Sequence, residues 1–205
     1  CFVSQLSQNY LENIANDDNT VADDTSAGKY YTEMEHHWDE AYGYFTDAID
    51  YPVNGTNRFW GKYANKSYLE GNLGTATNIS LAFRTGRAAI SAGNITGALA
   101  QKAIIVAEVK HMVAGMAIHY LNDAKGKIGT SSQDAINHSM SEALAFIFGI
   151  QFVTDSPDMS TADIMLLVNQ IEANVAGFTN NVQLINAAVD QIATATGLTA
   201  YKDIL

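Results

Sequence analysis

The helical period of the apolar residues constrains this chain more than any other feature of its sequence. Apolar side chains recur at intervals of three and four residues along most of its length, and no alternating segment of useful length interrupts them. The two prolines, Pro52 and Pro157, lie between or at the edges of the periodic segments. The pattern predicts an all-α helical bundle with no sheet beyond a stray two-residue bridge. The helices are expected at residues 2–15, 31–46, 77–92, 97–124, 132–153, 160–175 and 180–196.

Two of the segments between the predicted helices are long. Residues 16–28 form an acidic loop with Asp17 and Asp18 near its start, but it lacks the ligand spacing of an EF-hand, so we expect a solvated loop. Residues 47–76 form a connector with one short helical piece, and a connector of this length is often functional or packs as an irregular cap. We expect one all-helical domain over 1–205, with 1–76 and 77–205 as candidate halves that share a core.

Composition narrows the class of protein. Hydrophobic residues make up 47% of the chain and charged residues 16%, which is typical of a globular protein. The formal net charge of −11 excludes nucleic acid as an expected partner, because phosphate binding needs a cationic surface. Cys1 is the single cysteine, so no internal disulfide can form. The sequence shows no signal peptide or transmembrane run, so we expect a processed or truncated chain; Cys1 is either a lipidated first residue or an internal one.

The segment 31–46 carries the first candidate metal ligands. On a helical wheel its apolar stripe, predicted to face the 97–124 helix or its neighbour, consists of Met34, Trp38, Ala41 and Phe45. A second, polar stripe about a third of a turn away consists of Glu33, His37, Glu40 and Tyr44, flanked by His36. Carboxylate and imidazole ligands suit Fe, Mn or Zn, whereas the lack of thiolates argues against a structural zinc site. The alternative is a polar stripe at the edge of the core, with His–Glu pairs bridging to neighbours.

Two later helices repeat the combination of His and Glu. Glu108 and His111 share one sector of the largely apolar 97–124 helix, and a polar sector on a central helix needs partners. Glu142 lies among apolar residues, with His138 one turn earlier as its nearest candidate partner. If the bundle buries the apolar stripes, we expect His37 and Glu40 to lie within reach of Glu108, His111 or Glu142.

Three functions remain open from these residues. The first is a non-catalytic protein that binds a metal ion or an iron chelate, and the second is a structural or partner-docking module without a metal. The third is a di-iron redox protein, because Glu33/His36 and Glu108/His111 both have Glu-x-x-His spacing. The order of the helices counts against this third function. No nucleophile elbow, P-loop or H-E-x-x-H pattern is present, so we do not expect a hydrolase.

The stretch His37-Trp38-Asp39-Glu40 resembles the H-x-x-E core of the imelysin signature, with Glu35 at the place where a Gly is usual. Residues 31–45 and 58–63 resemble an uncharacterised group of bacterial cell-envelope lipoproteins related to imelysin. The resemblance implies a double helical bundle in the periplasm or at the cell surface, with a part in iron acquisition and an envelope protein as a further candidate partner. It also implies that this chain is the C-terminal part of a longer protein, lipid-anchored through a segment absent here.

Overall fold

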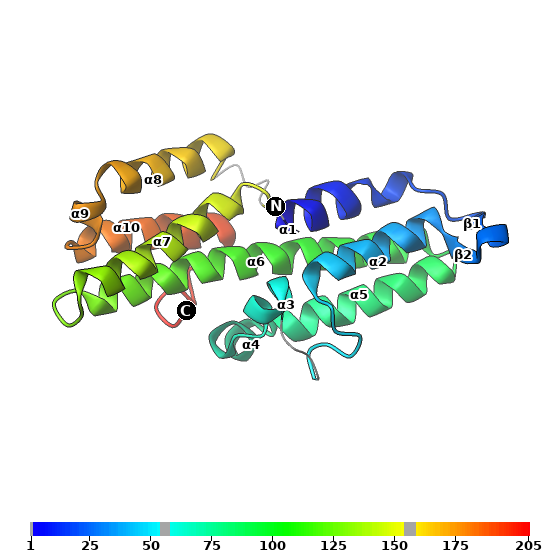
Figure 1. Cartoon of the computed structure of the whole chain (residues 1–205), viewed down its shortest axis with the longest axis horizontal. Helices are drawn as coiled ribbons and strands as arrows, with labels where there is room; N and C mark the ends of the chain where they lie inside the picture. The colour runs from blue at the N-terminus through cyan, green and yellow to red at the C-terminus, as the bar shows by residue number, and fades with distance from the viewer. Residues whose placement is uncertain (1, 54–57, 154–158) are drawn as a thin grey trace. The chain divides into compact units, whose positions relative to one another are not determined.

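The computed structural model describes residues 2–53, 58–153 and 159–205 (Figure 1). Helix accounts for 74% of the chain, which confirms the all-α prediction. The contacts within the chain divide it into two compact units, Cys1–Val109 and Lys110–Leu205. The division falls inside the long helix α6 (Ile95–Lys127), and each unit is described by itself below.

The first unit opens with an irregular helical segment. A short α1 (Phe2–Ser4) continues into a π-helical stretch, η1 (Gln5–Leu11), and a 3₁₀ turn, η2 (Ile14–Asn16), closes the segment. The buried side chains along it include Leu6, Leu11 and Ile14. The first predicted helix is therefore confirmed in extent, although much of it is not α-helical.

The acidic loop folds into a small antiparallel hairpin, which corrects the prediction of at most a two-residue bridge. Strands β1 (Ala22–Asp24) and β2 (Lys29–Thr32) pair through Ala22–Thr32 and Asp24–Lys29, with the 3₁₀ turn η3 (Thr25–Ala27) between them. The Asp24 carboxylate accepts hydrogen bonds from the backbone N–H groups of Ser26 and Ala27, at 3.0 and 3.2 Å. Local side-chain bonding of this kind is invisible to a search for hydrophobic alternation, and it explains why the hairpin was missed.

Helix α2 (Glu33–Phe45) begins at a capping box. The Thr32 hydroxyl accepts from the Glu35 N–H at 3.2 Å, and the Glu35 carboxylate accepts from the Thr32 N–H at 3.0 Å. The side chains that α2 buries are the predicted stripe, Met34, Trp38, Ala41 and Phe45. It packs against η1 and against α5 (Thr75–Ser91), the neighbour of α6 along the chain.

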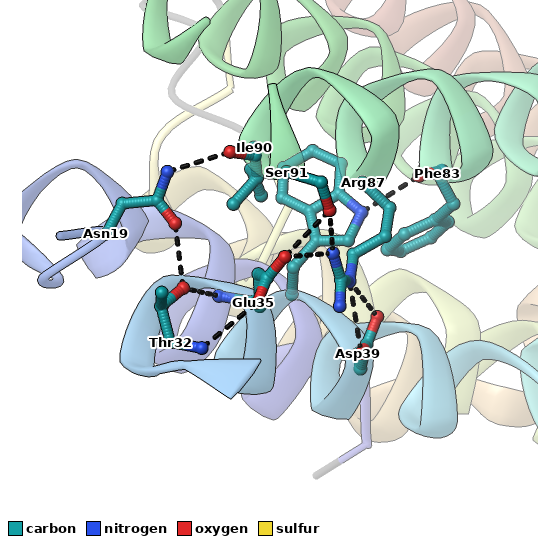
Figure 2. Close-up of polar contacts among 9 residues, drawn as sticks. Asn19, Thr32, Glu35, Asp39, Phe83, Arg87, Ile90 and Ser91 are labelled. Atoms are coloured by element: carbon teal, nitrogen blue, oxygen red, sulfur yellow. Dashed lines mark hydrogen bonds and ion pairs between the residues drawn. The ribbon is translucent and has the colours of Figure 1, made fainter. Parts of the chain in front are cut away.

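Trp38 fixes how closely α2 approaches α5. Its indole lies on Gly86, where an added Cβ atom would stand 2.1 Å from Cζ2 of the ring. The indole N–H donates a 2.9 Å hydrogen bond to the carbonyl oxygen of Phe83 (Figure 2). Helix α5 therefore provides both the packing surface for the Trp38 ring and the hydrogen-bond acceptor for its N–H group.

The connector after α2 packs as a cap on the first unit. It contains α3 (Phe59–Ala64) and α4 (Ser67–Leu73), two helices that the sequence did not resolve beyond one short helical piece. Buried Tyr51 donates its hydroxyl to the Gly61 carbonyl at 2.8 Å, while its own carbonyl accepts from Ser80 at 2.7 Å. These bonds attach Tyr51 to both α3 and α5.

The second unit contains α7 (Gln133–Ile150), α8 (Thr161–Ala173), α9 (Val175–Phe178) and α10 (Val182–Thr196), together with the C-terminal part of α6. Ser132, Ser160 and Asn181 cap the N-termini of α7, α8 and α10. A half-buried polar link joins α6 to α7. The Asp123 carboxylate accepts from Ser139 Oγ and from Lys127 Nζ, each at 2.6 Å.

Helix α6 passes a test of length and composition for a membrane span, with 33 residues and a mean hydropathy of 1.3 over its best window. More than half of that window, 56%, is buried inside the protein. The core helix of a soluble protein gives the same result, so the hydropathy of α6 is weak evidence for a span.

Replacing Trp38 by alanine should lower the free energy of unfolding by about 3–5 kcal/mol, the usual cost of deleting a large core side chain. Urea unfolding followed by circular dichroism measures this change. A loss below about 1 kcal/mol would contradict the burial of Trp38 between α2 and α5.

A second pair of variants tests the close approach of the two helices. Gly86→Ala should destabilise the protein by about 1–3 kcal/mol, because the new methyl group displaces the Trp38 indole. Gly43 is the matched control, since a Cβ atom added there meets nothing within 4 Å. Gly43→Ala should be neutral or stabilising by up to about 1 kcal/mol through helix propensity. Equal effects of the two substitutions would rule out the contact between Trp38 and Gly86.

Candidate functional site

Three side chains from separate turns of the first unit converge at the start of α2. Asp17, Glu33 and His37 each place one ligand atom within 4.8 Å of the others. The closest pair is His37 Nδ1 and Asp17 Oδ2, at 2.8 Å. Two carboxylates and one imidazole in this arrangement form a candidate site for a cation, here called the Asp17 cluster.

Backbone bonds hold the two chain segments of the Asp17 cluster together. The Asp18 N–H donates to Glu33 Oε2 at 3.0 Å, and the Met34 N–H donates to the Asp18 carbonyl at 3.1 Å. Asp17 is the residue that ends η2, and its backbone is extended. The loop is therefore attached to the first turn of α2, where helix geometry places His37 one turn after Glu33.

The cluster lies at the edge of the core. The side chain of Asp17 is 10% exposed and that of His37 is 32% exposed, while Glu33 is open to solvent. The ring of Tyr10 covers one side of His37, with 5.7 Å between the ring centroids, and stacks on Tyr44 at 5.6 Å. A cation bound here would have a buried inner wall and an open outer side available to water or to a chelating ligand.

The two residues of the H-x-x-E motif have different partners. His37 bonds to Asp17, whereas Glu40 pairs with His36, with 3.5 Å between Glu40 Oε1 and His36 Nε2. The His36 ring also stacks on Tyr31 at a centroid distance of 4.9 Å. The structure thus brings Glu33 and His37 together but does not bring Glu40 or His36 into the Asp17 cluster.

The remaining predicted ligands lie on α6 and α7. Glu108, in the first unit, accepts a 3.0 Å hydrogen bond from Asn78. In the second unit, His111 and Glu142 are half-buried and His138 is exposed on the surface of α7. The apolar residues around Glu142 in the sequence indicated a buried side chain, but in the structure Glu142 is only half-buried. That His37 and Glu40 lie within reach of Glu108, His111 or Glu142 stays a prediction.

A second polar network, missed by the sequence analysis, braces α2 against α5 (Figure 2). Arg87 donates from Nη1 to Glu35 Oε1 at 2.6 Å and from Nε to Asp39 Oδ1 at 3.0 Å. The Ser91 hydroxyl also donates to Glu35 Oε1, at 2.7 Å. These residues, Glu35, Asp39, Arg87 and Ser91, are called the Arg87 brace below.

The Arg87 brace is continuous with the hydrogen bonds of the hairpin. Thr32, which caps α2, donates from its hydroxyl to the Asn19 side chain at 2.7 Å, and Asn19 donates to the Ile90 carbonyl at 2.8 Å (Figure 2). Glu35 therefore takes part in both the capping box and the brace.

The pKa of Glu35 reflects these contacts. Burial raises it, but the hydrogen bonds from Ser91, from the Thr32 backbone and from Arg87 outweigh burial and hold the pKa below its ordinary value of 4.5. The folded protein therefore favours the ionised carboxylate. For Asp17 the sequence carried a signal, because it stands in the acidic loop before α2.

The fold and the site define a class: an all-α protein with a carboxylate–imidazole cluster at the start of one helix. The chain belongs to the family described as a domain of unknown function, DUF4856, whose model matches residues 2–199. The match carries no imelysin name. No curated protein and no solved structure matches the chain.

The lowered pKa of Glu35 predicts how acid acts on stability. A carboxylate whose folded-state pKa lies below 4.5 stabilises the fold fully above that ordinary value, and the contribution disappears as pH falls through the folded-state pKa. Glu35→Gln should therefore lower the free energy of unfolding by about 1–3 kcal/mol at neutral pH and by much less at about pH 3.

Urea titrations at several pH values measure that difference between the wild type and the variant. Glu172→Gln, on the exposed surface of α8, is the control and should stay within about 0.5 kcal/mol of the wild type throughout. A Glu35→Gln effect that did not change with pH would show that the ionised carboxylate contributes nothing.

Proposed function

We propose that this chain is a non-catalytic cation-binding module that holds one Fe, Mn or Zn ion, alone or as a small chelate, at the Asp17 cluster. The observation that carries the proposal is the convergence of Asp17, Glu33 and His37 within 4.8 Å. Oxygen and imidazole together suit these metals, and three protein ligands leave positions open for water or a chelator.

Electrostatics support a cation at this place. Two carboxylates this close repel each other, and a cation bound between them would remove that repulsion. A metal ion would replace the proton that joins His37 to Asp17. The net charge of −11 also raises the local concentration of cations around the protein.

The sequence resemblance adds a cellular setting to the proposal. His37 and Glu40 resemble the H-x-x-E core of imelysin-like envelope proteins, so we place the module in the bacterial periplasm or at the cell surface, in iron acquisition. Glu40 would act indirectly, because its partner is His36 and not His37. Cys1, the candidate for a lipid anchor, lies outside the described residues.

A structural module that docks an envelope partner without a metal is the second candidate. The observation in its favour is that the polar residues of α2 already have protein partners: His37 bonds to Asp17, His36 to Glu40, and Glu35 to Arg87. The di-iron function is less well supported, because Glu33 and His36 of the first Glu-x-x-His pair lie in different polar groups.

Calorimetric titration of untagged protein with Zn²⁺, with Mn²⁺ and, without oxygen, with Fe²⁺ tests the proposal. We expect one ion per chain, and at least tenfold weaker binding in His37→Ala and in Asp17→Asn. Binding should release protons and weaken below about pH 5, because protons compete for the same ligand atoms.

His36→Ala is the matched control, since His36 is adjacent in sequence but bonds outside the Asp17 cluster. It should bind the metal as the wild type does. No binding by the wild type would favour the structural module, and two irons per chain would favour the di-iron protein. Equal losses in His36→Ala and His37→Ala would place the site elsewhere.

A further inference from the structure

A pocket of about 430 Å³ opens between α2 and α5, apart from the Asp17 cluster. Its volume lies in the range of small-molecule sites. One wall comes from α2 and the segment after it, and the other wall from α5. The residues that line it are Trp38, Asp39, Tyr42, Ile49, Phe83, Arg84, Arg87, Ala88 and Ser91.

Three aromatic side chains, Trp38, Tyr42 and Phe83, are among the residues that line the pocket. Phe83 meets Trp38 and Tyr42 edge to face, with ring centroids 5.8 and 5.3 Å apart. Trp38 and Phe83 are almost fully buried, so Tyr42 is the ring that offers most surface to a ligand. Ile49, which is 96% exposed, adds an apolar side chain at the rim. Such a surface favours a flat, apolar molecule.

Most polar groups in the pocket are already satisfied by the protein. Arg87, Asp39 and Ser91 bond within the Arg87 brace. The Tyr42 hydroxyl donates to the Ala48 carbonyl at 2.6 Å. A ligand gains little from these groups, because each new bond to them would break an existing one.

Arg84 is the exception. Its side chain is exposed on α5, and it makes no hydrogen bond or ion pair with any residue in the described ranges. Its charge acts at the pocket wall: burial raises the pKa of Tyr42, the Arg84 guanidinium lowers it, and the Asp50 carboxylate raises it. The chain has three arginines, Arg58, Arg84 and Arg87, and two of them line this pocket despite a net charge of −11.

We propose that this pocket binds a small organic carboxylate with a flat apolar body. The body would lie against Tyr42 and Ile49, above the buried Trp38 and Phe83, and the carboxylate would accept hydrogen bonds from the planar guanidinium of Arg84. The pocket shares no residue with the Asp17 cluster, so this inference is independent of the proposed metal site.

Nuclear magnetic resonance with two matched probes tests the inference. Naphthalene carboxylate and the isosteric naphthalene carboxamide differ mainly in charge. The chain has two tryptophans, and only Trp38 lines the pocket, so its indole N–H signal should move while that of Trp60 stays. We expect the carboxylate to bind about tenfold more tightly than the carboxamide.

Two arginine variants complete the design. Arg84→Gln should abolish the preference for the carboxylate and weaken its binding about tenfold, while the carboxamide binds as before. Arg58→Gln is the control, because Arg58 pairs with Asp47 outside the pocket, and it should change neither affinity. Equal affinity of the wild type for both probes, equal effects of the two variants, or no movement of the Trp38 signal would overturn the proposal.

Discussion

The contact between Trp38 and α5 is the interaction on which the first unit depends. The indole lies against Gly86 and donates its N–H to the Phe83 carbonyl, so one side chain sets both the distance between α2 and α5 and their register. The Arg87 brace is a consequence, since Glu35 and Asp39 can reach Arg87 only when the helices lie this close. The pocket beside the brace has Trp38 and Phe83 in its lining for the same reason.

The first turn of α2 brings the structural and the candidate functional residues together. Glu33 attaches the preceding loop through the Asp18 N–H, and Glu35 closes the capping box and accepts from Arg87. His37, one turn on, faces Asp17 from that loop. The geometry of the Asp17 cluster therefore depends on the same hydrogen bonds that begin the helix. A helix start held at several points gives potential ligands a fixed position before any ion binds, which lowers the cost of binding.

Charge is distributed unevenly around this helix. On the side of the Asp17 cluster, carboxylates outnumber positive groups, whereas the pocket has one guanidinium without a partner among the described residues. The Arg87 brace lies against the pocket and satisfies Arg87 with two carboxylates. The two proposals thus concern opposite ligand charges, a cation at the Asp17 cluster and an organic anion at Arg84.

The sequence by itself determined the helical class, the approximate helix positions and the buried face of α2. These features follow from periodicity, which is local, and Met34, Trp38, Ala41 and Phe45 were confirmed as buried for that reason. Only the tertiary structure decided the partners of the polar residues. Asp17 meets His37 across 20 residues of chain, and Glu35 meets Arg87 across 52, separations that no helical wheel can connect. The hairpin also escaped the sequence analysis, because the bonds of the Asp24 side chain shape its turn while hydrophobic alternation is absent. Hydrophobic periodicity along the chain predicts which face of a helix is buried, but long-range packing determines which charged groups come into contact.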